Sequence, residues 1–69
     1  MQPIIKRIQD KVIGQNNLIA IALQNAIFEN QESNVIISNI QDMAKDNYVM
    51  IRSILGKELL TDIINYRNE

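Results

Sequence analysis

Apolar residues recur every three or four positions along most of this chain, which is the period of an amphipathic α-helix. Pro3 suits the first turn of a helix because its missing N–H is not needed there, and Gly14 and Gly56 are typical of helix ends. The pattern predicts helices at about 3–13, 17–30, 34–55 and 57–67. We therefore expect an all-α protein, a compact bundle of three to four short helices.

The stretch 18–28 is the most apolar part of the chain. Nine of its eleven residues are apolar, and only Gln24 and Asn25 interrupt them. Apolar positions on all sides of a helix are typical of a buried helix rather than a surface one. We expect the helix at 17–30 to lie at the centre of the bundle. Because a membrane-spanning helix needs about 20 apolar residues, we also expect no membrane association.

The segment 34–55 contains neither glycine nor proline. Its apolar positions keep helical spacing throughout, which favours one continuous helix of about twenty residues with a wide apolar face. The alternative, two helices with a turn at 46–48, stays open. The apolar line consists of Ile37, Ile40, Ala44, Tyr48, Ile51 and Leu55.

The length of 69 residues predicts a single domain, 1–69. A chain of this size buries only about 60% of the surface that its unfolded form exposes, so it is marginally stable without further help. The chain has no cysteine and no histidine, which excludes disulfides and leaves zinc or copper without good ligands. We therefore expect self-association, most simply as a homodimer, to complete the bundle.

The residue types also argue against catalysis. Without histidine, no serine has the neighbouring base that nucleophilic catalysis of the triad type needs. The carboxylate pairs Asp42/Asp46 and Glu58/Asp62 lie beside lysines and are typical of a solvated helix face. The two isolated glycines do not form a phosphate-binding loop. We expect no enzymatic activity and no cofactor. Since the N-terminus lacks a signal-peptide pattern, we expect a cytoplasmic protein.

The helices from residue 34 onward have more apolar width than one packing face needs. Methionine is common at adaptable binding surfaces, and an exposed apolar patch marks an interface. We therefore expect a small protein-interaction or oligomerisation module with a regulatory or scaffolding role, whose partner is a second copy or another protein. The predicted partner or dimer interface consists of Met43, Met50, Ile54, Leu59 and Ile63.

A DNA-binding regulator is the alternative. Residues 40–57 are superficially similar to a helix-turn-helix, with the small residue Ala44 in the first helix, a turn at 46–48 and a recognition helix at 49–57. The turn lacks a glycine, the apolar period runs through it, and the net charge of −1 gives no attraction to nucleic acid. The candidates for contacting bases and phosphates are Asn47, Arg52, Ser53 and Lys57.

Overall fold

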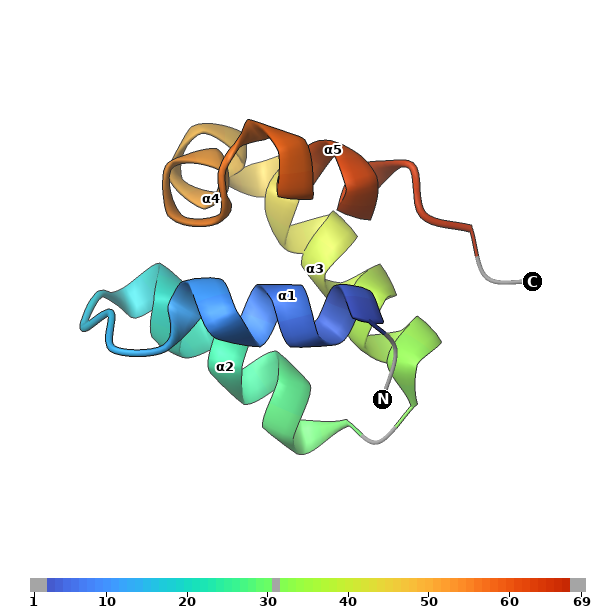
Figure 1. Ribbon diagram of the computed structural model, residues 1–69, viewed down its shortest axis with the longest axis horizontal. Helices are drawn as coiled ribbons and strands as arrows, with labels where there is room; N and C mark the ends of the chain where they lie inside the picture. The colour runs from blue at the N-terminus through green and yellow to red at the C-terminus, as the bar shows by residue number, and fades with distance from the viewer. Residues whose placement is uncertain (1–2, 31, 68–69) are drawn as a thin grey trace.

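The computed structural model describes residues 3–30 and 32–67, which fold into five helices with no strand among them. These are α1 (Pro3–Val12), α2 (Leu18–Glu29), α3 (Ser33–Asp46), α4 (Tyr48–Leu55) and α5 (Lys57–Ile64). Figure 1 shows α1 and α2 on one side of the bundle, α4 and α5 on the other, and α3 running between them. The prediction of an all-α bundle is confirmed, with one helix more than expected.

The additional helix arises from a break at Asn47, so the prediction of one continuous helix over 34–55 was wrong. Asn47 has φ −136° and ψ 46°, which lies outside the helical region. Its backbone N–H donates to the Met43 carbonyl at 2.9 Å, and its own carbonyl accepts from the Ile51 N–H at 3.0 Å. One residue therefore ends α3 and begins α4. Because the junction is so short, the apolar spacing passes through it undisturbed.

Helix α4 packs against each of the other four helices, although the first turn of α4 is exposed. Its residues Ile51 and Leu55 are fully buried. Helix α2, which we expected to be central, is buried along one face only, at Ala20, Leu23 and Ile27. That expectation was wrong because an apolar composition does not require that every face be covered.

The core of the described residues is purely apolar, with no buried polar or charged side chain. Burial of hydrocarbon surface therefore supplies the main driving force for this fold. The buried residues are Ile4, Ile5, Ile8, Val12, Ala20, Leu23, Ile27, Ile36, Ile37, Ile40, Ala44, Ile51, Leu55, Leu59, Leu60 and Ile63.

Two glutamines at the edge of the core donate hydrogen bonds to backbone carbonyls at or just beyond the ends of other helices. The Gln24 Nε2 of α2 donates to the Val12 carbonyl at the end of α1 (3.0 Å). The Gln41 Nε2 of α3 donates to the Ile63 carbonyl (2.9 Å) and the Tyr66 carbonyl (3.3 Å) at the end of α5. The last carbonyls of a helix have no partner within the helix, so these contacts hold neighbouring helices together at their ends.

Candidate interaction surfaces

The outward face of α2 is an apolar surface that the fold leaves uncovered. Leu18 is 84% exposed and Phe28 is 82% exposed, and Ile21 and Asn25 are exposed between them. At 100° per residue these four side chains lie on the side of α2 opposite its buried face. We call the four residues the α2 stripe. Residues 18–28 include no charged side chain, so the stripe is apolar apart from one amide.

Local interactions fix the start of this helix. The Asn17 Oδ1 accepts a hydrogen bond from the Ala20 backbone N–H at 2.8 Å, which is the interaction of an N-cap residue. Helix α2 therefore begins at Leu18, and Leu18 stands in its first turn. The cap and the buried face together set the rotation of α2, and this rotation turns the stripe toward solvent.

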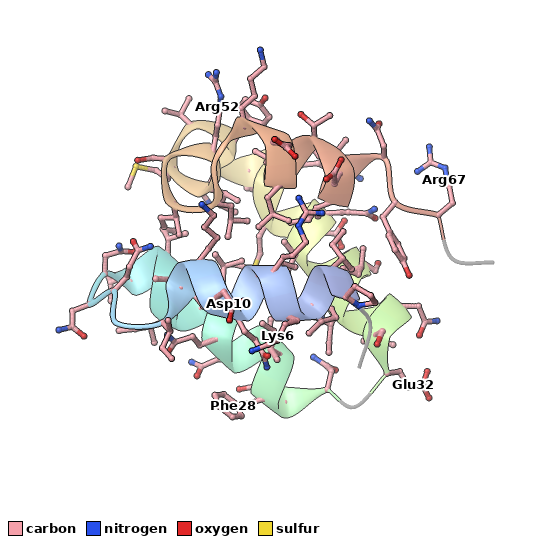
Figure 2. All side chains as sticks on the ribbon, in the orientation of Figure 1. Lys6, Asp10, Phe28, Glu32, Arg52 and Arg67 are labelled. Carbon is pink, nitrogen blue, oxygen red and sulfur yellow. The ribbon has the colours of Figure 1, made fainter. Side chains whose placement is uncertain are left out.

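An open groove runs beside the α2 stripe, between α1 and α2. It has a volume of about 360 Å³ and is lined by both helices. Ile13 and Phe28, both well exposed, form apolar parts of its wall. Lys6 and Asp10, whose Nζ and carboxylate form an ion pair at 3.3 Å, also line it; Figure 2 labels both side chains on α1. The groove offers an apolar floor beside one compensated pair of charges.

Three consecutive apolar residues are exposed on the first turn of α4. They are Tyr48, Val49 and Met50, and Val49 is 76% exposed. We call these three residues the α4 patch. In Figure 2, Arg52 of α4 and Phe28 of α2 project from opposite sides of the molecule. The Phe28 end of the α2 stripe therefore lies far from the Arg52 side chain, although α2 and α4 contact each other elsewhere.

Comparisons with protein-family models, with curated protein sequences and with solved structures find no match for this chain. What the chain does must be inferred from its own surfaces.

The predicted interface residues do not form one surface. Met50 is exposed as part of the α4 patch, whereas Met43 and Ile54 are half-buried and packed against the core. Leu59 and Ile63 are buried inside the chain, so neither side chain can form an interface in this fold. The prediction that these two residues form an interface was wrong, because α5 packs its most apolar face against α3 and α4.

The structure instead exposes residues that the sequence placed in the core. Leu18, Ile21 and Phe28 lie in the stretch that seemed the most buried. The available signal was the spacing of Leu18, Ile21, Asn25 and Phe28 at intervals of three, four and three, opposite a second complete apolar face. A helix with two apolar faces buries one of them by packing on one side and leaves the other face exposed.

The residues of the DNA-binding alternative are all exposed. Arg52, Ser53 and Lys57 line one shallow depression together with Val49, while Asn47 stands at the junction of α3 and α4. Within residues 3–30 and 32–67, neither Arg52 nor Lys57 forms an ion pair. The structure thus brings three of the four candidates together.

The carboxylates of the described residues are placed as surface groups. The Asp62 carboxylate forms an ion pair with the Arg7 guanidinium (2.9 Å), and the Asp42 carboxylate lies 3.7 Å from the Lys45 Nζ. No group of three or more carboxylates that could hold a metal ion occurs in the part of the chain that the structure describes. In that same part, none of the helices has the length and apolar character needed to cross a membrane.

Proposed function

We propose that this chain is a small, non-enzymatic protein-interaction module with a regulatory or scaffolding role. The observation that carries the proposal is the α2 stripe, where Leu18 and Phe28 stand almost fully in solvent on an uncharged helix face. Removing such surface from water yields about 25 cal/mol per Å², and contiguous apolar patches of this kind mark interaction sites.

The presence of exposed apolar residues on two different helices supports a scaffolding role in particular. Phe28 of the α2 stripe and Arg52 of α4 project from opposite sides of the molecule (Figure 2). A ligand bound at the Phe28 end of the stripe would therefore leave α4 free for a second partner. A rigid bundle of five short helices would hold two partners at a fixed distance without any catalytic group.

Substitution of Val49 in the α4 patch tests this function. A tagged chain is used to capture proteins from the cells that make it, and the captured proteins are quantified by mass spectrometry. We expect Val49→Asp to lower recovery of the α4 partner at least about tenfold. Burying a carboxylate in an apolar contact weakens the binding free energy by more than about 1.4 kcal/mol, which corresponds to a tenfold change in affinity.

The matched control is Ser38→Asp, which adds the same charge at an exposed position of α3. This variant should retain the partner, and the retained protein should then bind the purified wild-type chain in calorimetry. If a variant with both Val49→Asp and Leu18→Glu captures the same proteins as the wild type, the two surfaces are not the binding sites and the proposal is wrong.

Nucleic-acid binding through α4 is the second candidate. The break at Asn47 favours it, because residues 40–57 do form two helices, and Arg52, Ser53 and Lys57 gather in one depression. Two features place it second. A helix-turn-helix joins its helices by a turn of three or four residues, whereas one residue joins α3 and α4. The net charge of −1 also provides no long-range attraction to phosphates.

A mobility-shift titration separates the two candidates. A protein-interaction module should shift neither duplex DNA nor RNA, even at low salt. A nucleic-acid module would shift them and would lose affinity steeply as the salt concentration rises. Its binding free energy would weaken by about 1–3 kcal/mol on Arg52→Ala. Lys6→Ala, which removes one positive charge at an exposed position far from Arg52 (Figure 2), is the control. A shift that Arg52→Ala abolishes and Lys6→Ala preserves would replace the first candidate by the second.

A further inference from the structure

The α2 stripe has the spacing of a coiled-coil seam. Leu18, Ile21, Asn25 and Phe28 follow at intervals of three, four and three, which is the repeat that keeps one helix face against a partner helix. The outward face of α2 is therefore suited to a second helix rather than to a flat surface or a small molecule.

We propose that a second copy of this chain covers the α2 stripe, with the two α2 helices packed antiparallel about a twofold axis. This inference rests on the proposed interaction function and names the partner of one of its two surfaces. The spacing is symmetric about Leu23, so an antiparallel pair sets Leu18 opposite Phe28 of the other copy and Ile21 opposite its Asn25. The same patch thus serves both copies, as a twofold dimer requires.

The charges at the ends of α2 select the antiparallel orientation. Glu29 is exposed at the C-terminal end, and the first turn of α2 contains no acidic residue. In the antiparallel pair, Glu29 lies opposite Asn17 of the other copy, at the helix N-terminus that carries partial positive charge. A parallel pair would instead place both Glu29 carboxylates at the same end of the pair, away from either helix N-terminus. Electrostatics therefore disfavours the parallel pair and stabilises the antiparallel one.

The exposed area agrees with a weak, specific dimer. Leu18, Ile21 and Phe28, with Ile13 beside them in the groove, offer on the order of 500 Å² of apolar surface per copy. Two copies would bury on the order of 1,000 Å², which is the lower range of specific protein interfaces. Because Phe28 lines the groove, Leu18 of the other copy has an apolar recess beside it to enter. We expect a dissociation constant on the order of micromolar.

Two complementary variants test the pairing, namely Leu18→Glu and Phe28→Lys. Both positions are more than 80% exposed, and an acid in the first turn and a base in the last turn both suit the helix dipole, so the monomer fold should persist. Sedimentation equilibrium across a concentration series should show dimers for the wild type. Each variant alone should dimerise at least about tenfold more weakly, because a charge replaces an apolar contact at both ends of the seam.

An equimolar mixture of the two variants should restore association as a heterodimer, observed at 1:1 by native mass spectrometry. In the antiparallel pair the new carboxylate meets the new ammonium at one end, while the original Leu18–Phe28 contact remains at the other. A parallel pair has no such complement. Ser38→Glu and Asn39→Lys, at exposed positions of α3, are the controls and should dimerise like the wild type.

Three results would overturn the inference. In the first, the wild-type chain stays monomeric at about 1 mM. In the second, the single variants dimerise as tightly as the wild type. In the third, the mixture of variants remains monomeric although the wild type dimerises. None of these touches the α4 patch, whose partner is tested separately by Val49→Asp. A monomeric chain that still loses its captured partner on Val49→Asp would overturn the dimer and leave the proposed function standing.

Discussion

Replacing Ile51 with alanine should lower the free energy of unfolding by about 2–5 kcal/mol, the usual cost of removing a large aliphatic side chain from a core. Ile51 is 0% exposed and lies on α4, the helix that packs against all four others. A cavity at this position loses contacts with several helices at once, and the surrounding helices cannot close it without separating from one another. A chain of 69 residues has a total stability of only about 3–10 kcal/mol, so this loss is a large share of it.

Urea denaturation followed by circular dichroism at one fixed protein concentration measures the effect. The concentration must be fixed because any self-association adds to the apparent stability. Val49→Ala is the matched control, since Val49 lies two residues away on the same helix but is largely exposed. It should change stability by no more than about 0.5 kcal/mol. Equal effects of the two substitutions would show that Ile51 is not part of the core.

Replacing Gly56 with alanine should cost about 1–3 kcal/mol, through backbone strain alone. Gly56 joins α4 to α5 at φ 89° and ψ 154°, a region of the conformational map that only glycine populates readily. A Cβ at this position meets no atom within 4 Å, so steric contact with neighbouring residues does not contribute. The substitution therefore measures the conformational requirement of the α4–α5 turn by itself.

Thermal and urea unfolding of Gly56→Ala should shift in the same direction, with the slope of the urea transition unchanged. Ser53→Ala, at an exposed position of α4, is the control for adding or removing a small group and should be nearly neutral. If Gly56→Ala is as stable as the wild type, the turn does not need positive φ. The close packing of α4 against α5, which depends on that turn, would then require a different explanation.

The two proposed surfaces have a joint consequence. A dimer formed through the α2 stripe would carry two α4 patches, one from each copy. Partners that present two matching sites would then bind with an effective concentration set by the spacing of those patches, and with an avidity above that of a single patch. Dimerisation through α2 would in this way regulate binding at α4 without any contact between the two surfaces.

The candidate site could be predicted only in part. Met50 is exposed as the sequence indicated, because the apolar face of its helix is wider than its packing contacts require. The prediction of Leu59 and Ile63 was wrong, because the apolar face of α5 is covered by α3 and α4. Conversely, the spacing of Leu18 and Phe28 indicates a second apolar face on α2, but a helix that is apolar on all sides does not show which of its faces is buried.

The sequence by itself determined that the chain is helical and where most helices begin and end. Pro3, Gly14 and Gly56 mark those boundaries through backbone preferences that act within a few residues. The tertiary structure alone decided that the chain breaks at Asn47, that α4 contacts all four other helices, and that the α2 stripe remains in solvent. Periodicity is a property of one helix, whereas burial depends on which helices meet. Five short helices on 69 residues do not provide enough surface to cover every apolar face.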